Sequence, residues 1–432
     1  MNKTMKQQKF PSSAIFKATL GAIAALATLV GGINNAHAAN ANPVIMVNGL
    51  GGFDRAEALG FKYWGGKADL QAQLRNAYSG AQPIYTLTVG GYSSNWDRAV
   101  ELYYQIKGGC VDYGATHSTA AGHTRTGRCY TGVYPTWSAT NPVHLVGHGM
   151  GGQTARMLAQ LLAANGSPKN ASLFGTTAVS AAWIKSVSTV ASPNDGSTLP
   201  DVIKDNVPYV QAFVSRLARE AGGRNDLNDM VYDFRLDQWS IPVRATGEAF
   251  GTYFDRVLRS SWWYGTGTDR ATYDMSPKGA ADMNAWVSTL STVYYFSWST
   301  SASLKNTSNT FHYPRGDTNS MLAQFCGPDY MGNTTRNQAS FPVIDSTWWE
   351  SDCIVPTRSQ KAPTIKTSGT SFIATGAVIN NISVSGTPQV GKWNWKGLKT
   401  GVDHLDVVGW VTNPTFDALG FYKAHIDQLR TL

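Results

Sequence analysis

The stretch that decides the fold reads VHLVGHGMGGQTARMLAQLLAA and spans Val143–Ala164. Its opening VHLV is a short apolar run, which indicates a buried strand, and the segment from Gln153 onward has the residue pattern of a helix. The glycine-rich stretch between them allows the chain to turn sharply. A strand, a sharp turn and a helix in this order are typical of a nucleophile elbow, whose motif is G-x-S-x-G. Gly149 stands at the serine position of that motif.

Short apolar, β-branched runs alternate with helical patterns along the rest of the chain. This alternation predicts an α/β fold with a mostly parallel central sheet and helices on both faces. The predicted strands are 43–48, 83–89, 143–147, 184–191 and 292–298. The predicted helices are 97–106, 153–164 and 415–429. Because the sequence has no low-complexity linker and no internal repeat, we expect one domain with long insertions over residues 39–432.

The N-terminus has the composition of a secretory signal peptide. Four lysines and no acidic residue lie before an apolar run that extends from Ala18 to Val30. A cleavage site made of small residues follows and ends at Ala38. The run is too short for a membrane anchor, and no later segment is apolar enough to span a bilayer. We therefore expect residues 1–38 to be removed and the chain to be secreted, with no integral membrane segment after cleavage.

Charge and cysteine content narrow the class of protein further. Subtracting the four lysines of the leader lowers the formal net charge from +8 to about +4. No basic stripe remains that could neutralise a row of phosphates, so we expect no nucleic-acid partner. Four cysteines in an exported chain predict disulfides, for which three pairings exist. Proximity in the sequence favours Cys110 with Cys129 and Cys326 with Cys353.

A further stretch predicts an amphipathic helix with two interpretations. Between Asn206 and Ala221 apolar residues recur at helical spacing, and charged residues lie on the opposite face. Such a helix either lies on the protein surface in the ordinary way or covers an apolar cleft as a movable lid. The residue pattern alone does not distinguish between the two.

Acyl transfer on this type of fold needs an orienting acid and a histidine base, which follow the nucleophile in that order along the chain. The histidines beyond the elbow are His312, His404 and His425. His425 falls in the C-terminal helical pattern and His312 in a polar loop, so His404 is the preferred base. Asp352 is the preferred acid, because a disulfide through the adjacent Cys353 would fix its loop. Spacing alone leaves other loop residues open for both roles.

Backbone N–H groups are the expected donors to a negatively charged oxygen, one from Met150 after the elbow and one from Leu50. Leu50 lies in the glycine-rich loop NGLGG at 48–52, which follows the first predicted strand. A glycine-rich loop also occurs as a plain turn. Its position directly after the first strand favours a role beside the substrate.

Six blocks of the chain resemble the zinc-containing thermoalkalophilic lipases of Gram-positive bacilli, the I.5 family. They are FKYWGG at 61–66, SSNWDR at 93–98, VDYG at 111–114, GGQTARML at 151–158, LDQW at 236–239 and VDHL at 402–405. The resemblance covers nearly the whole chain after the leader. It implies an α/β-hydrolase fold with a zinc-loop insertion at about 92–130 and a helical lid at about 200–240. It also implies hydrolysis of triacylglycerols and related acyl esters at an oil–water interface.

The same resemblance assigns roles to individual residues. It implies a serine at the position of Gly149, with Asp352 as the acid and His404 as the base, and it favours a lid at 206–221. It also implies a structural zinc site, because two aspartates and two histidines offer the mixed oxygen and nitrogen ligation of a closed tetrahedral site. The implied zinc ligands are Asp97, His117, His123 and Asp237.

Calcium is the second metal that the resemblance implies. Asp406 stands at the position of one ligand, and Asn306 offers a backbone carbonyl. Val411 replaces a second carboxylate. Because calcium needs several oxygen ligands, this site has less support than the zinc site.

Together these residues predict a secreted lipase-family carboxylic ester hydrolase with a Ser-His-Asp type site that lacks its serine. Glycine adopts positive φ freely, so the fold should tolerate the replacement. No other hydroxyl or thiol is placed to attack, so we expect activity to be absent or strongly impaired, at the level of water attack assisted by His404. The alternative is a non-catalytic protein that binds lipids or acyl chains on the same scaffold.

Overall fold

The computed structural model describes residues 39–432, except for 203–206, 221–230, 384–385 and 412. The described residues belong to one compact unit, Ala39–Leu432. The predicted signal peptide at 1–38 lies outside the described residues. No helix in the described part of the chain combines the length and the apolar character needed to cross a membrane.

A seven-stranded sheet lies at the centre of the described residues, and each pair of neighbouring strands in it is parallel. In spatial order the strands are β12 (Ile379–Asn381), β13 (Trp393–Thr400), β7 (Tyr294–Ser301), β6 (Ile184–Val190), β5 (Val143–His148), β1 (Val44–Val47) and β2 (Ile84–Leu87). Because β1 and β5 are neighbours, the loops that follow them meet at one edge of the sheet. The predicted α/β fold with a mostly parallel sheet is confirmed.

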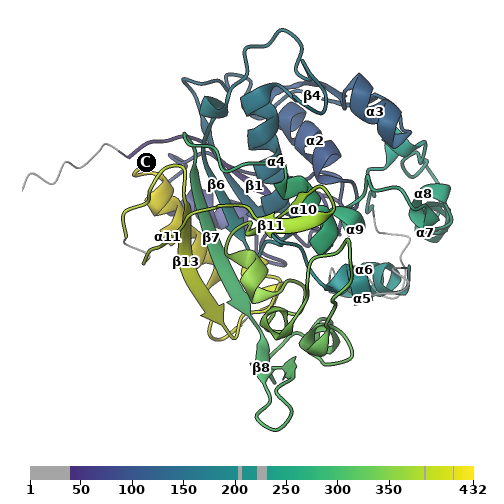
Figure 1. Ribbon diagram of the computed structural model, residues 1–432. Helices are drawn as coiled ribbons and strands as arrows, with labels where there is room; N and C mark the ends of the chain where they lie inside the picture. The colour runs from purple at the N-terminus through teal and green to yellow at the C-terminus, as the bar shows by residue number, and fades with distance from the viewer. Residues whose placement is uncertain (1–38, 203–206, 221–230, 384–385, 412) are drawn as a thin grey trace, which may run out of the picture. The chain divides into compact units, whose positions relative to one another are not determined.

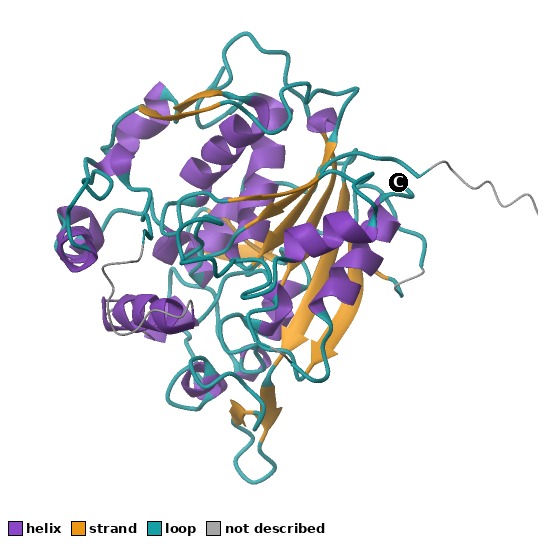
Figure 2. Ribbon diagram, turned by 180° about the vertical axis from the view of Figure 1, so that it is seen from behind, coloured by secondary structure: helices purple, strands orange, loops and turns teal. Residues whose placement is uncertain are grey.

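Helices cover both faces of this sheet, as Figures 1 and 2 show. The helices on one face are α1 (Leu70–Ala77) and α11 (Ala418–Leu429), and those on the other are α2 (Asn95–Lys107) and α4 (Met150–Ala164). The side chains of β1 alternate between two cores, so that Val44 and Met46 face the first and Ile45 and Val47 the second. A strand that is buried on both faces reads as a continuous apolar run, which is why β1 was predictable.

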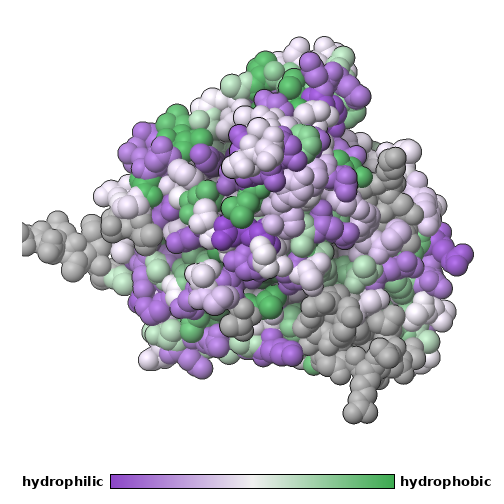
Figure 3. Space-filling model, turned by 90° about the horizontal axis from the view of Figure 1, so that it is seen from below, coloured by the Kyte–Doolittle hydropathy of each residue, from purple (hydrophilic) through white to green (hydrophobic). Residues whose placement is uncertain are grey.

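Burial in these two cores leaves few large apolar side chains at the surface. On the face shown in Figure 3, hydrophobic residues lie in small groups among hydrophilic ones. Two helices of the core begin at capping residues: Ser94 accepts a hydrogen bond from the N–H of Asp97 at the start of α2, and Asp69 accepts one from Ala72 at the start of α1. By contrast, α4 has no capping side chain, because it begins directly after Gly149.

The remaining elements lie in insertions between the strands of the sheet. Among the described residues the small antiparallel hairpins are β3–β4 (Gly109–Asp112 and Thr126–Tyr130), β8–β9 (Ser303–Lys305 and His312–Pro314) and β10–β11 (Ile365–Ser368 and Ser371–Ala374). The other helices are α3 (Ala115–Ala121), α5 (Leu199–Val202), α6 (Val207–Glu220), α7 (Phe250–Leu258), α8 (Ser261–Tyr264), α9 (Ala271–Asp274) and α10 (Pro277–Asn284). Cys110 is bonded to Cys129 and Cys326 to Cys353, so both predicted disulfides are confirmed.

The predicted elements all occur, and each end lies within three residues of its predicted position. The predicted amphipathic helix at 206–221 is α6. Two strands of the sheet, β12 and β13, were not predicted. The assignment of His312 to a loop is wrong, because its backbone pairs with Lys305 in the β8–β9 hairpin.

Candidate active site

The turn at Gly149 has the geometry of an elbow. β5 ends at His148 and α4 begins at Met150, so Gly149 is the single residue between strand and helix. Its backbone has φ 54° and ψ −129°, on the positive-φ side that residues with a side chain rarely adopt. Gly147 allows β5 and α4 to pack closely, since a Cβ there would lie 2.2 Å from the carbonyl oxygen of Gly151. The turn is therefore as tight as a nucleophile elbow requires.

His404 and Asp352 lie beside the tip of this turn. Nδ1 of His404 donates to Oδ2 of Asp352 at 2.8 Å. A Cβ placed on Gly149 would lie 2.9 Å from Nε2 of the same imidazole. The structure thus brings together the residues that the sequence suggested for the nucleophile position, the acid and the base. Their arrangement is that of a Ser-His-Asp triad without the hydroxyl.

The carboxylate of Asp352 is fully buried and is held from several sides. Its Oδ1 accepts hydrogen bonds from the N–H groups of Ile354 and Val355, at 3.0 and 2.7 Å. Its Oδ2 accepts a further bond from the hydroxyl of Thr300 at 2.9 Å. The next residue, Cys353, is tied into a disulfide. These contacts fix the carboxylate, so it can hold the imidazole in one orientation.

The two expected oxyanion donors lie at the same edge of the sheet. Met150 is the first residue of α4, and Leu50 belongs to the loop after β1. Within the described residues neither backbone N–H has a hydrogen-bond partner. A Cβ on Gly49 would lie 3.5 Å from the nitrogen of Met150, so this loop packs against the start of α4. Both N–H groups are therefore available to an oxygen atom bound beside Gly149.

A buried arginine ties the loop after β1 to its neighbours. Arg98 in α2 donates to the carbonyl oxygens of Asn48 and Gly90, at 2.5 and 2.6 Å. Its Nε donates to the hydroxyl of Thr154 in α4 at 2.8 Å. Burial lowers the pKa of Arg98 to about 10, so the guanidinium stays charged at neutral pH. One side chain thus connects the loops after β1 and β2 with the elbow helix.

Tyr63 and His148 connect the same loop to the base. The N–H of Gly49 donates to the hydroxyl of Tyr63 at 2.8 Å, and this hydroxyl donates in turn to Nδ1 of His148 at 2.7 Å. Nε2 of His148 then donates to the backbone carbonyl of His404 at 3.0 Å. The direction of these hydrogen bonds is set by the carbonyl oxygen of His404, because it can only accept; a neutral His148 then carries its hydrogen on Nε2 and accepts at Nδ1. Burial and the nearby His404 hold the pKa of His148 well below its usual value, which keeps it neutral.

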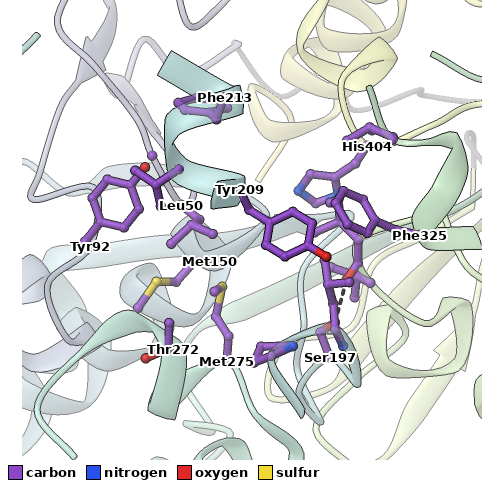
Figure 4. A pocket seen from close by; sticks show the side chains of 18 of the residues that line it. Leu50, Tyr92, Met150, Ser197, Tyr209, Phe213, Thr272, Met275, Phe325 and His404 are labelled. Carbon is purple, nitrogen blue, oxygen red and sulfur yellow. Dashed lines mark hydrogen bonds between the residues drawn. The ribbon is translucent and has the colours of Figure 1, made fainter. Parts of the chain in front are cut away.

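A cavity of about 250 Å³ opens beside these groups. Its wall includes Leu50, Gly149, Met150 and His404, together with apolar side chains from other segments such as Phe325. Figure 4 shows the labelled side chains gathered around the space into which the imidazole points. A mostly apolar wall with a few polar groups at one end is typical of a site for a ligand with a hydrocarbon chain.

Helix α6 covers part of this cavity. Val210 and Val214 are buried, and the ring of Phe213 stacks on that of Trp410 with centroids 6.0 Å apart. Both Tyr209 and Phe213 line the cavity. The predicted helix therefore borders the cavity, and its role as a movable lid stays a prediction.

A second cluster of ligating side chains is built by the insertion after β2 together with the segment before α9. One ligand atom from each of four residues falls within 4.8 Å of the others, and these residues are Asp97, His117, His123 and Asp269. Nε2 of His117 lies 3.1 Å from Oδ1 of Asp97, and Nε2 of His123 lies 3.3 Å from Oδ2 of Asp269. The last two atoms are buried and have no hydrogen-bond partner among the described residues. Buried nitrogen and oxygen atoms that face one another without a regular hydrogen bond fit the donor set of a metal ion.

The prediction of Asp237 as the fourth ligand is wrong. Its two carboxylate oxygens accept hydrogen bonds from the guanidinium of Arg128, each at 2.5 Å. Asp269, which directly precedes Arg270 and α9, takes the fourth place. The neighbour of Asp237 does reach the cluster, because Nε2 of Gln238 donates to Oδ2 of Asp97 at 2.9 Å. The LDQW block therefore lies beside the cluster without supplying a ligand to it.

Comparison with known proteins assigns the chain to a family. The family described as "Lipase-like, C-terminal domain" matches residues 40–429. The chain belongs to this lipase family. Lipase 1 of Staphylococcus aureus (strain MRSA252) is 30% identical over 393 residues, which cover 87% of this chain and 52% of the relative. The lipase of Staphylococcus epidermidis is 30% identical over 385 residues, covering 86% and 50%. The chain thus spans about half the length of these curated relatives.

Solved structures of three bacterial proteins share this fold. EstA from Clostridium botulinum is 38% identical, with a TM-score of 0.79 over 91% of this chain and 88% of that one. Lipase 1 from Pelosinus fermentans is also 38% identical, with a TM-score of 0.76 over 91% and 99%. The Staphylococcus hyicus lipase is 27% identical, with a TM-score of 0.70 over 90% and 96%. The α/β-hydrolase fold of this lipase family member is therefore confirmed.

The residues suggested for calcium have partners within the protein. Oδ2 of Asp406 accepts hydrogen bonds from the N–H of Asp403 at 2.9 Å and from the amide of Asn413 at 2.8 Å. Burial raises the pKa of Asp406 to about 6. Asn306 lies in the turn between β8 and β9, where its Oδ1 accepts from the N–H of Ser308. Calcium binding by this lipase family member stays a prediction.

Sequence patterns did not single out four residues that help to build the site beside Gly149 and the metal-ligating cluster. They are Tyr63, Arg98, His148 and Asp269. Tyr63 and Arg98 lie in the blocks FKYWGG and SSNWDR, and this is the signal that could have marked them. His148 lies inside the elbow motif, at a position that the motif leaves variable, so the motif gives it no role. Asp269 lies in TGTDRATYD, which has no ligand spacing of its own.

Proposed function

We propose that this chain binds acyl esters, including triacylglycerols, in the cavity beside Gly149 and hydrolyses them only very slowly. The observation that carries the proposal is the distance of 2.9 Å between Nε2 of His404 and the position of a Cβ on Gly149. An imidazole oriented by Asp352 at this point is suited to take a proton from a hydroxyl at the elbow. Glycine offers no such hydroxyl.

With serine at position 149, each group of the site would have a defined task. The serine oxygen would attack the ester carbon, and His404 would take its proton and pass it to the leaving alcohol. The N–H groups of Leu50 and Met150 would stabilise the negative oxygen of the intermediate. With Gly149, the attacking oxygen has to come from water, for which His404 can act as the base. Serine hydrolases that lose one triad member retain about 10³- to 10⁴-fold catalysis over water.

A non-catalytic acyl-binding protein is the second candidate, and one contact favours it. A Cβ at 2.9 Å from an imidazole nitrogen is closer than ordinary van der Waals contact. A side chain at position 149 would therefore push against the ring of His404. The site as it stands fits glycine better than serine.

We also propose that the second cluster holds a structural zinc ion, with Asp97, His117, His123 and Asp269 as its ligands. Two nitrogen and two oxygen donors suit tetrahedral zinc, and two of these atoms are buried without another partner. The four residues come from α2, from the segment around α3 and from the segment before α9. A metal bound here would cross-link three segments that are far apart in the sequence.

Secretion through the leader at 1–38 belongs to the same proposal. The two disulfides support it, because disulfides persist in oxidising compartments. N-terminal sequencing of protein recovered outside the cell tests it, and we expect the mature chain to begin at Ala39. Protein that is exported with residues 1–38 still attached would contradict cleavage at this site.

Hydrolysis of p-nitrophenyl butyrate by the parent chain and by Gly149→Ser tests the catalytic part. We expect Gly149→Ser to raise kcat/KM by about 10³-fold or more, the scale on which triad members matter. A fluorophosphonate should label Gly149→Ser and leave the parent chain unlabelled, because it reacts with an activated serine. The double variant Gly149→Ser/His404→Ala is the matched control and should stay slow. A folded Gly149→Ser protein that is as slow as the parent chain would refute the proposal.

A further inference from the structure

A guanidinium lies in the mostly apolar wall of the cavity, at Arg270. The described residues that line the cavity include no lysine, aspartate or glutamate, and Arg270 is their only arginine. This part of the wall therefore carries one permanent positive charge and no negative charge to balance it. Because a charge in apolar surroundings is costly unless it is paired, the partners of Arg270 decide whether its charge is available to a ligand.

Arg270 is half-buried and has few partners of its own. Its Nη1 donates to the backbone carbonyl of Trp263 at 3.4 Å, which is longer than a typical hydrogen bond from nitrogen to oxygen. Its Nε is buried and has no hydrogen-bond partner in the described part of the chain. Within the same residues no carboxylate forms an ion pair with the guanidinium. The adjacent Asp269 acts on it only through its charge and faces the histidines of the metal cluster.

The neighbours of Arg270 place it on the side of the cavity that lies away from the elbow. The central carbon of its guanidinium lies 5.5 Å from the centroid of the Trp262 ring. The N–H of the next residue, Ala271, donates to the carbonyl oxygen of Tyr92 at 2.9 Å. Tyr92 and His404 lie on opposite sides of the cavity in Figure 4. A ligand that reaches both sides therefore meets the imidazole at one end and the guanidinium at the other.

We infer that Arg270 binds a carboxylate at the far end of an ester substrate, so that the chain selects monoesters of dicarboxylic acids. The inference rests on the proposed use of the cavity for acyl esters. The ester group would lie beside Gly149, and the hydrocarbon chain would cross the apolar part of the cavity. The terminal carboxylate would then accept hydrogen bonds from the guanidinium.

Donor geometry and charge both favour a carboxylate at Arg270. The planar fork of a guanidinium matches the two oxygens of a carboxylate, and charge-assisted hydrogen bonds are about twice as strong as neutral ones. One negative charge balances the single positive charge, whereas a doubly charged phosphate would leave a charge unpaired in the apolar wall. Burial lowers the pKa of Arg270, and a bound anion would oppose this effect. A substrate that ends in a methyl group gains none of these interactions.

Calorimetric titration of the parent chain at neutral pH tests the inference. The ligands are the monomethyl and dimethyl esters of adipic, suberic and sebacic acid, because the two esters of each acid share one chain and differ by one negative charge. We expect the best monoester to bind at least about tenfold more tightly than its diester, the scale of one hydrogen bond to a charged group. This preference should peak at one chain length, because the elbow and Arg270 lie at a fixed separation.

Arg270→Met removes the charge and keeps a long apolar side chain. It should bring the affinities of the monoester and the diester to within about twofold of each other and leave that of the diester unchanged. Arg259→Met is the matched control, because Arg259 is exposed and does not line the cavity, and it should keep the preference. Since Arg270 follows a residue of the metal cluster, the zinc content of each variant is measured alongside. Arg270→Lys, which keeps the charge without the fork, should keep part of the preference and replaces Arg270→Met if that variant does not fold.

Equal affinity of the parent chain for monoester and diester at all three lengths would overturn the inference. A preference that Arg270→Met leaves intact would overturn it too, because the carboxylate would then bind elsewhere. Selective monoester binding by a chain whose Gly149→Ser form is inert would refute the catalytic proposal alone. An active Gly149→Ser form with no monoester preference in the parent chain would refute this inference alone.

Discussion

Removal of metal from the cluster of Asp97, His117, His123 and Asp269 should destabilise the protein by an amount that depends on pH. In the metal-free state burial lowers the pKa of His117, but hydrogen bonds to Asp269 and Asp97 outweigh burial and raise it from 6.5 to about 9. The same carboxylates raise the pKa of His123 to about 10 against the effect of burial. At neutral pH two protonated imidazoles therefore supply the positive charge that the carboxylates need.

The sign of the pH effect follows from these values. A group whose pKa is higher in the folded protein stabilises the fold fully below its unfolded pKa, and this stabilisation is lost as pH rises through its folded pKa. For His117 the window runs from 6.5 to about 9, and the loss across it is about 3 kcal/mol. The metal-free protein should thus lose stability as pH rises above neutral. Zinc binds unprotonated imidazoles, so its stabilising effect should be largest at the alkaline end.

Urea unfolding followed by tryptophan fluorescence, at a series of pH values from neutral to alkaline, measures this effect with excess EDTA or with saturating zinc. Two variants that replace an aspartate with asparagine form a matched pair, one inside the cluster and one beside it. Asp269→Asn should abolish the response to zinc, whereas Asp237→Asn should keep it, because Asp237 is paired with Arg128. An equal loss of the free energy of unfolding with EDTA at every pH, or the opposite behaviour of the two variants, would contradict this prediction.

Three further predictions concern the buried polar groups and the lid. Acid should destabilise the fold through His144 and His425, because burial lowers both pKa values from 6.5 to about 3. The free energy of unfolding, measured with urea, should therefore fall as pH drops through this range, by up to about 1.4 kcal/mol per pH unit for each histidine. Tyr63→Phe should lower the free energy of unfolding by about 1–3 kcal/mol, because the buried N–H of Gly49 loses its acceptor, and an unchanged value would contradict this role. Phe213→Ala should speed the association of an acyl ligand such as octanoate with the cavity by about tenfold in stopped-flow measurements, because loss of the partly buried ring contact with Trp410 weakens the hold of α6 over the cavity. An unchanged rate would count against α6 as a lid.

The strands and the elbow were predictable because each carries its signal in a few consecutive residues. β1 is apolar at every position, since both of its faces are buried. β13 was missed because it reads WNWKGLKT, in which two lysines interrupt the apolar pattern. In the structure Lys396 is buried, and its Nζ donates to the side-chain oxygen of Gln428 at 2.7 Å. A partner 32 residues away in the sequence offsets part of the cost of burying this amine, and no local pattern reveals such a partner.

The fourth member of the metal cluster illustrates the same limit. Asp237 and Asp269 are both single acidic residues in segments without a ligand motif. In the folded chain Asp237 pairs with Arg128, whereas Asp269 faces the two histidines. The position of Arg128 follows from the β3–β4 hairpin and not from residues next to either aspartate. Sequence blocks thus located the neighbourhood of the cluster, and only the tertiary contacts assign its ligands.

The substitution Gly149→Ser should have opposite effects on stability and on activity: it should lower the free energy of unfolding and raise the rate of ester hydrolysis. Serine at φ 54° costs about 1–3 kcal/mol relative to glycine, and its Cβ meets Nε2 of His404 at 2.9 Å. The cost of the positive φ is a property of the backbone and stays in every variant. The cost of the contact between Cβ and Nε2 disappears when the imidazole of His404 is removed. Gly149→Ser should therefore destabilise the parent chain more than it destabilises His404→Ala, with a coupling of about 0.5 kcal/mol or more in a double-mutant cycle. A coupling of zero would mean that the ring moves aside without cost, and the fit of this site to glycine would then lose its physical basis.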